Sequence, residues 1–184
     1  MKSLQGLARA IDRLNETIGV TVALLALLLV LVEFTVVLMR YVFGVGSVKM
    51  QESIVYMHAI IFMVAGGYTL LHNGHVRCDI FYAAAAPRRQ ALIDLIGVAV
   101  FLLPTCALIA WAAWPYVTQA WAVQEGSPEG SLGIPGVYLL KSVILVFAGL
   151  VALQGLALAI HSALRLAGRE AAPATPAHEG EPGL

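Results

Sequence analysis

The pattern of hydrophobic and polar positions along the chain shows four long apolar segments separated by polar stretches. They cover about residues 18–39, 53–71, 91–117 and 137–166. An α-helix needs about 20 predominantly apolar residues to cross the hydrocarbon core of a bilayer, and each segment is about that long or longer. The pattern therefore predicts an all-α integral membrane protein with four transmembrane helices, which form one membrane domain over residues 1–167.

The stretches that connect and follow these segments differ in composition. Residues 80–86 combine bulky apolar side chains with a run of alanines, which predicts a short amphipathic segment in the membrane interface. Residues 125–136 are rich in glycine, proline and serine, which indicates a loop made of turns. Residues 168–184 contain mostly Ala, Pro, Glu and Gly. Such a segment buries too little apolar surface to fold, so we predict a disordered tail.

The composition supports a lipid environment and argues against several other classes of protein. The chain of 184 residues is 60% hydrophobic and 12% charged, whereas about a quarter of the residues in a soluble domain are charged. The net charge of zero gives no reason to expect a nucleic-acid partner. The two cysteines, Cys78 and Cys106, indicate neither a disulfide framework nor a metal site. The sequence contains no catalytic constellation and no phosphate-binding glycine loop, so we expect no enzyme activity.

The basic residues predict how the four helices are oriented. With four spans, one side of the membrane carries Lys2, Arg9, Arg13, Arg77, Arg88, Arg89, Arg165 and Arg169. The other side carries only Arg40, Lys49 and Lys141. Because short cytoplasmic segments are enriched in lysine and arginine, we expect both termini and the tail to be cytoplasmic. The loops over residues 44–51 and 119–136 then face outward.

Two pairs of polar residues lie where the first two helices are predicted to run antiparallel. Ionisable groups inside a membrane are costly, so each of them is a functional hypothesis by default. Antiparallel pairing places Glu33 level with His58, and Arg40 level with Glu52. We predict that these pairs form a structural polar lock between the two helices. The alternative for Glu33 is a proton or cation site on a transport path.

Small residues recur along the fourth segment at Gly155, Ala159 and Ala163. A spacing of four residues puts them on one helix face, where small side chains allow a second helix to approach closely. We predict a helix-packing stripe, whose partner is either another helix of this chain or another subunit.

Arg88 and Arg89 lie just before the third segment, at the predicted cytoplasmic surface. Arginines in this position either contact lipid phosphate groups or belong to a solvated, positive-inside loop. We treat them as candidate contacts for lipid headgroups, with the solvated loop as the alternative.

The five histidines raise a second hypothesis, a haem-binding membrane anchor subunit of an electron-transfer complex. A bis-histidine haem needs two imidazoles at a similar depth on facing helices. His58 lies near the outer end of the second helix, whereas His161 lies roughly 30 Å deeper at about 1.5 Å per residue. His72 is closer in depth to His161 but sits at the membrane edge. We therefore expect no cofactor in this chain.

A series of short motifs resembles one family of membrane proteins. In order they are Arg40-Tyr41-Val42-Phe43, Glu52 opening the second helix, Gly66-Gly67 late in it, and Gly74-His75-Val76-Arg77-Cys78-Asp79 just inside. Their order and spacing resemble the small permease subunit of TRAP transporters (tripartite ATP-independent periplasmic transporters), the DctQ-like family. The chain departs from the usual pattern at Gln51, where the family often has a second acidic residue, and at Cys78, which replaces a common valine or isoleucine.

The resemblance implies a role, partners and a location. In such systems a soluble periplasmic solute-binding protein captures an organic acid, and a large membrane subunit holds the substrate and sodium sites. The small subunit braces the large one in the bacterial inner membrane and helps to dock the binding protein. The resemblance therefore implies no cofactor in this subunit, with sodium expected in the large one.

The resemblance also implies roles for particular segments. The outward loops become candidates for docking, with Glu125 and Glu129 as contacts to the partner. The motif residues just inside the second helix either fix the inner turn against lipid or the large subunit, or only stabilise a local turn; they are Gly74, His75, Arg77 and Asp79. The residues Gly133-Ile134-Pro135, with Tyr138 and Lys141, look most like the branch grouped with mannitol and chloroaromatic transporters.

Overall fold

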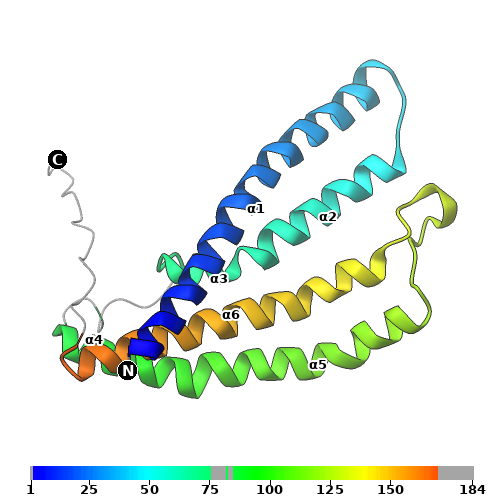
Figure 1. Cartoon of the computed structure of the whole chain (residues 1–184). Helices are drawn as coiled ribbons and strands as arrows, with labels where there is room; N and C mark the ends of the chain where they lie inside the picture. Colours follow the sequence, from blue (N-terminus) through cyan, green and yellow to red (C-terminus); the bar gives the residue numbers. More distant parts are fainter. Residues whose placement is uncertain (1, 76–81, 83–84, 170–184) are drawn as a thin grey trace, which may run out of the picture.

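The chain is folded into helices over the residues that the computed structural model describes, which are 2–75, 82 and 85–169. The α-helices, labelled as in Figure 1, are α1 (Lys2–Val42), α2 (Val48–Val64), α3 (Gly66–Leu71), α4 (Pro87–Gly97), α5 (Leu103–Ala122) and α6 (Val137–Leu166). A π-helical turn, η1 (Val98–Leu102), joins α4 to α5. A short 3-10 turn, η2 (Gly130–Leu132), lies in the loop before α6.

Within the described part of the chain, four helical runs are long and apolar enough to cross a membrane. They are Leu4–Val42, Val48–Leu71, Pro87–Ala122 and Val137–Leu166. This finding confirms the prediction of an all-helical protein with four long apolar helices. Most of the predicted interfacial segment, at residues 80, 81, 83 and 84, lies outside the described residues, as does the predicted tail from residue 170 onward.

Two helical hairpins, α1–α2 and α5–α6, lie close together at one end of the molecule and separate toward the other (Figure 1). The first end carries the start of α1, the end of α6 and α4, and we call it the terminal end. The second carries the loops over residues 43–47 and 123–136, and we call it the loop end. Helix α6 is the central element, because it contacts α1, α2, α3, α4 and α5.

Helix α1 begins much earlier than the apolar pattern predicted, at Lys2 rather than near residue 18. Its first turns bury Ala8, Ile11 and Asn15 at helical spacing, and Ala8 and Ile11 pack on Ala157 of α6. Charged residues interrupt the apolar run in this region, so continuous hydrophobicity does not indicate that the helix begins before residue 18. The 3.6-residue period of the buried positions is the signal that identifies an amphipathic extension of the helix.

The second membrane segment is interrupted at Ala65, where α2 ends and the short helix α3 follows. Gly66 and Gly67 are buried at this point, and a Cβ on Gly66 would lie 2.8 Å from the ring of Phe147 in α6. A Cβ on Gly67 would lie 3.2 Å from a backbone oxygen of α6 and would clash with Asn15 of α1. The two glycines therefore let α3 approach both helices more closely than any other residue would permit.

The third membrane segment changes its helical geometry just before Pro104. The N–H of Leu103 donates to the carbonyl of Val98, five residues back, which is the π-helical pattern. Pro104 has no backbone N–H, so it cannot donate the hydrogen bond that an α-helical residue makes to the carbonyl four residues before it. The third membrane segment thus contains a π-helical turn directly before Pro104.

Candidate functional site

A single carboxylate holds the loop before α6 to helix α2. Glu52, in the second turn of α2, accepts hydrogen bonds from the hydroxyl of Ser127 and, at 2.6 Å, from the backbone N–H of Ile134. Gly133 packs against this contact, since a Cβ there would lie 2.7 Å from a Glu52 oxygen and would clash with Ser127. Glu52 therefore fixes the loop at two points, and the close approach requires glycine at position 133.

The predicted pair Arg40–Glu52 is not formed. The two Glu52 oxygens accept from Ser127 and Ile134, and the exposed Arg40 guanidinium makes no hydrogen bond or ion pair with any described residue. The prediction matched the depths of two residues on neighbouring helices. Equal depth does not determine how a helix is rotated about its axis, and α2 turns Glu52 toward the loop rather than toward α1.

Further contacts fix both sides of the same loop. The ammonium of Lys141 in α6 lies 2.5 Å from the carboxylate of Glu125 and 3.9 Å from the centre of the Tyr116 ring. The indole N–H of Trp121 in α5 donates to the hydroxyl of Ser142 in α6 at 2.8 Å. Glu125, predicted as a docking residue, is thus an anchor that holds its own loop.

The outer surface of the loop remains open. Glu129 is exposed; its backbone N–H donates to the Ser127 hydroxyl oxygen at 3.0 Å, and its carboxylate has no partner among the described residues. Val123 and Leu132, in the same loop, are 73% and 65% exposed. We call Val123, Glu129 and Leu132 the loop-end surface. It combines a charge with apolar side chains on a loop whose backbone is already fixed.

The predicted pair Glu33–His58 is also not formed. Both residues are exposed, and no hydrogen bond or ion pair joins them in the described part of the chain. The His58 ring instead stacks on Phe62, one turn further along α2, with ring centroids 5.5 Å apart. The predicted lock between α1 and α2 is therefore not formed, and neither Glu33 nor Arg40 has a side-chain partner among the described residues.

A buried polar cluster joins α1 to α6 at the terminal end, where the sequence analysis placed none. The amide of Asn15 donates to the Gln154 side-chain oxygen at 2.8 Å, and the amide of Gln154 donates to Asp12 at 2.9 Å. A ring nitrogen of His161 lies 3.0 Å from the other Asp12 oxygen. Asn15 is 0% and Gln154 3% exposed. We call these four residues the terminal polar cluster. The sequence signal for it, which was missed, is the single amide side chain that Asn15 and Gln154 each place among the apolar positions of a helix.

Two histidines at the terminal end meet carboxylates. In addition to His161 on Asp12, a ring nitrogen of His72 lies 2.7 Å from Glu16 of α1, and the His72 ring packs on Tyr68. Among residues 2–75, 82 and 85–169, no group of three or more His, Cys, Asp or Glu side chains is placed to hold a metal ion. These imidazoles tie α1 to α3 and α6.

The predicted small-residue stripe of α6 divides between two environments. Gly155 is buried inside the chain, where an added Cβ would lie 3.6 Å from Val98 and would clash with Leu102. Ala159 and Ala163 instead line a shallow cavity of about 260 Å³ beside Leu4 of α1. Only the first of the three residues thus serves close packing against the α4–α5 segment.

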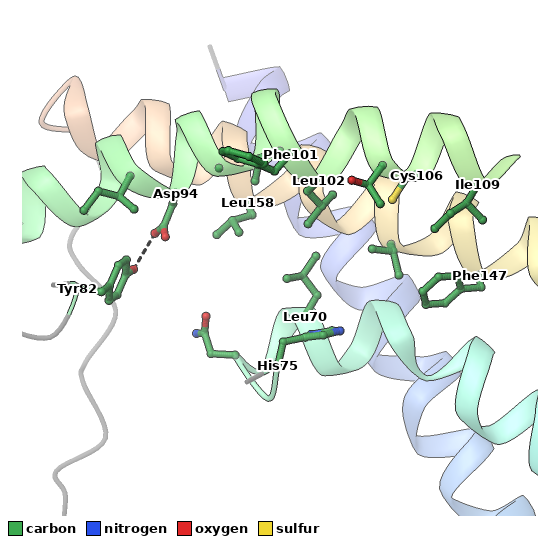
Figure 2. Close-up of a pocket in the computed structure, with 16 residues that line it drawn as sticks. Leu70, His75, Tyr82, Asp94, Phe101, Leu102, Cys106, Ile109, Phe147 and Leu158 are labelled. Atoms are coloured by element: carbon green, nitrogen blue, oxygen red, sulfur yellow. Dashed lines mark hydrogen bonds between the residues drawn. The ribbon is translucent and has the colours of Figure 1, made fainter. Parts of the chain in front are cut away.

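An apolar crevice of about 570 Å³ lies between the end of α3, the α4–α5 segment and α6. Figure 2 shows Phe101, Leu102, Cys106 and Ile109 along one wall, with Leu70 and Phe147 facing them. At one end the hydroxyl of Tyr82 donates to Asp94 at 2.8 Å (Figure 2). The described residues that line the crevice include no lysine or arginine. The crevice therefore suits an apolar group; its polar lining residues include Asn73, His75 and Thr105, and its acidic residue is Asp94.

The inner motif is described only in part, because Arg77 and Asp79 lie outside the described residues. Gly74 closes the end of α3: its N–H donates to the Thr69 carbonyl at 2.8 Å, and Asn73 before it has a left-handed φ of 54°. This is the hydrogen-bond pattern of a Schellman turn. His75 follows and lines the crevice. The turn itself accounts for Gly74.

Arg88 and Arg89 lie in the first turn of α4 and are both exposed at the terminal end. Pro87 begins this helix, at the position where its missing N–H costs no hydrogen bond. The two arginines therefore lie in the first turn of the third membrane-length run, with their side chains exposed.

The fold and these clusters define a multi-pass helical membrane protein whose polar side chains hold helices and loops together. Residues 29–165 match the family described as "Tripartite ATP-independent periplasmic transporters, DctQ component". This stretch covers most of the chain, so the protein belongs to the DctQ family of TRAP transporter components, as the motifs predicted. It is a transporter component and not a member of an enzyme family. No curated protein and no solved structure shows a significant match to the chain.

Membership of a tripartite system implies two protein partners. They are a large permease subunit and a periplasmic binding protein. Among the described residues, the loop end and the exposed helix faces are the surfaces that such partners could contact.

Proposed function

We propose that this subunit braces the large permease subunit and presents part of the docking surface for the periplasmic solute-binding protein. The observation that carries the proposal is the fixed loop over residues 123–136. Glu52 and Lys141 hold it to α2 and α6, while Val123, Glu129 and Leu132 stay exposed. A surface that is already ordered loses little conformational entropy when a partner binds, which favours a docking role.

The transported solute is an organic acid, and its binding site and the sodium sites belong to the large subunit. The lining of the crevice in the present chain supports the assignment of the solute site to the large subunit. A carboxylate-bearing solute binds most strongly to a charged donor such as arginine or lysine. Neither residue type is among the described residues that line the crevice, and the Asp94 carboxylate there is acidic and accepts a hydrogen bond from Tyr82. We expect this subunit to hold neither solute nor cofactor.

The subunit lies in the bacterial inner membrane with the loop end in the periplasm and both termini in the cytoplasm. The positions of the described basic residues support this orientation, since Arg9, Arg13, Arg88, Arg89 and Arg165 all lie toward the terminal end. Arg88 and Arg89 are then at the level of the cytoplasmic headgroups, where they contact lipid phosphates.

The chain belongs to the branch grouped with mannitol and chloroaromatic transporters. Of the residues that suggest this branch, Gly133 sits against Glu52 and Ser127, and Lys141 pairs with Glu125. These residues shape the loop rather than a solute site. We therefore expect membership of this branch to determine how the loop docks on its partner, and not which solute is transported.

The test uses the complete transporter in cells that take up its solute, with an affinity tag on the present chain. The double variant Glu129→Lys and Leu132→Asp alters the loop-end surface, and Ala167→Lys is the matched control at the terminal end. We expect the double variant to retain the large subunit on purification but to lose binding of the solute-binding protein and most uptake. The control should change neither.

Two results would contradict the proposal. If the large subunit never co-purifies with the tagged chain, the bracing role is wrong. If the double variant binds the solute-binding protein and supports uptake as the unmodified chain does, the docking role of the loop-end surface is wrong.

A further inference from the structure

One face of α1 is buried at the terminal end and uncovered at the loop end. Asn15 and Val22 are 0% and 8% exposed. Glu33 lies 18 residues after Asn15, and Arg40 lies 18 residues after Val22. Eighteen residues are five turns at 3.6 residues per turn, so each later residue lies on the same line along the helix as the earlier one. The face that Asn15 turns toward α6 therefore continues to Glu33 and Arg40.

Toward the loop end none of the residues that the structure describes covers the face. Helix α1 rises away from α6 there, with α2 as its neighbour (Figure 1). Glu33 and Arg40 are both exposed, and their side chains make no hydrogen bond or ion pair with any described residue. Val30 and Val37, which flank Glu33 at helical spacing, are 59% and 44% exposed. We call Val30, Glu33, Val37 and Arg40 the Glu33 face.

The two charged residues of this face differ in depth. Arg40 lies two residues before the end of α1, and its long side chain reaches the membrane surface from there. Glu33 lies nine residues before the end at Val42, on the order of 13 Å along the axis at 1.5 Å per residue. A glutamate side chain is too short to span that distance. Ionisable groups at such a depth face a protein interior or a water-filled cavity rather than lipid.

We infer that the Glu33 face packs against a transmembrane helix of the large permease subunit, which presents a basic side chain to Glu33. The inference rests on the proposed bracing role and assigns the place of the contact. Charge complementarity selects a basic partner, because a carboxylate removed from water is stabilised by a charged donor in hydrogen-bond contact. The flanking valines supply the apolar surface that excludes lipid around the pair.

A second copy of this chain does not satisfy the same face. Two copies inserted in the same orientation and related by a two-fold axis along the membrane normal bring Glu33 against Glu33 and Arg40 against Arg40. Like charges at close range repel, so a symmetric dimer through this face leaves both carboxylates without a counter-charge. The partner must therefore be a different chain.

The test places a photo-crosslinking amino acid at neighbouring positions in the otherwise unmodified, co-expressed transporter. Val37 and Leu38 form a matched pair, as they lie at the same depth and are 44% and 40% exposed. Val37 shares the Glu33 face at a spacing of four, whereas Leu38 does not. Val30 and Leu31, 59% and 55% exposed, form a second pair of the same kind. We expect adducts with the large subunit from Val37 and Val30, and none from Leu38 and Leu31.

A second measurement concerns the charge itself. Glu33→Leu should reduce the amount of large subunit that co-purifies by at least about tenfold, because it leaves a basic group of the partner buried and unpaired. Leu31→Ala, on the opposite face, should have no effect. Membrane levels of each variant, measured before purification, separate loss of contact from loss of folding.

The outcomes separate the two proposals. Adducts from Leu38 and Leu31 alone, or full retention of the large subunit by Glu33→Leu, would overturn the assignment of the Glu33 face. In both cases the unmodified chain still retains the large subunit, so the bracing role stands. Absence of the large subunit from purified unmodified chain overturns the bracing role, and the assignment falls with it.

Discussion

The hydroxyl of Ser127 donates a hydrogen bond to the carboxylate of Glu52, although 75 residues separate the two in the sequence. With the Ile134 N–H on the other carboxylate oxygen, this contact ties the α5–α6 hairpin to the α1–α2 hairpin at the loop end. The hairpins separate toward this end (Figure 1). The loop is thus the bridge that joins them where their helices have moved apart.

Removing the Glu52 carboxylate should release this loop without unfolding the helices. We expect Glu52→Ala to make residues 123–136 several times more susceptible to limited proteolysis, because Ser127 and Ile134 lose their common acceptor. Cleavage rates of the purified subunit in detergent measure the effect. Glu129→Ala is the matched control, since the Glu129 carboxylate has no partner among the described residues. Equal cleavage of both variants would show that Glu52 does not hold the loop.

A methyl group at Gly67 should destabilise the contact between α3, α1 and α6. Gly67→Ala places a Cβ against Asn15 and 3.2 Å from a backbone oxygen of α6. Overpacking of this kind typically costs about 1–3 kcal/mol, and thermal unfolding in detergent measures the loss. Gly149→Ala is the control, because a Cβ there meets nothing within 4 Å; it should raise stability slightly through its better helix propensity. A Gly67→Ala variant as stable as the control would contradict the close approach.

Asn15 and Gln154 should be energetically coupled. Their side chains share a 2.8 Å hydrogen bond and are both almost fully buried. A double-mutant cycle with Asn15→Leu and Gln154→Leu should give a coupling of about 0.5–2 kcal/mol, the range for buried polar pairs in contact. The free energy of unfolding of the four proteins provides the cycle. Additive effects of the two substitutions would mean that the terminal polar cluster does not lock α1 to α6.

The orientation makes a prediction about chemical labelling. In a background with Cys78→Ser and Cys106→Ser, a cysteine introduced at Leu132 should react with a membrane-impermeant maleimide from the periplasmic side. A cysteine at Ala167, exposed at the terminal end, should react only after the inner membrane is permeabilised. The reverse pattern would show that both termini are periplasmic.

The sequence was most informative about the membrane spans, and least about contacts between them. Continuous apolar runs located all four spans, because the bilayer thickness imposes a minimum length that does not depend on partners. The amphipathic start of α1 was missed because its apolar positions recur at helical spacing rather than in a run. The glycine pair at Gly66 and Gly67 was noted as a motif, but its cause, the approach of Asn15 and Phe147, comes from distant parts of the chain.

The polar contacts between helices could not be predicted from the positions of residues along each helix. Matching depths along the helix axes predicted the pairs Glu33–His58 and Arg40–Glu52, and neither pair is formed among the described residues. The rotation of each helix is set by packing that sequence spacing does not reveal, so Glu52 faces Ser127 and Glu33 faces outward. For the same reason Asp12 and His161, which are 149 residues apart, gave no sign of their contact.

The central position of α6 has a consequence for how the protein is made. Every other α-helix packs on α6, and α6 follows all of them along the chain. The first three spans therefore enter the bilayer without the helix that organises them, and the terminal polar cluster stays open until Gln154 and His161 are inserted. Packing of the first three spans is therefore completed only after α6 has been inserted, because Asn15 and Asp12 meet Gln154 and His161, which lie 139 and 149 residues later in the chain.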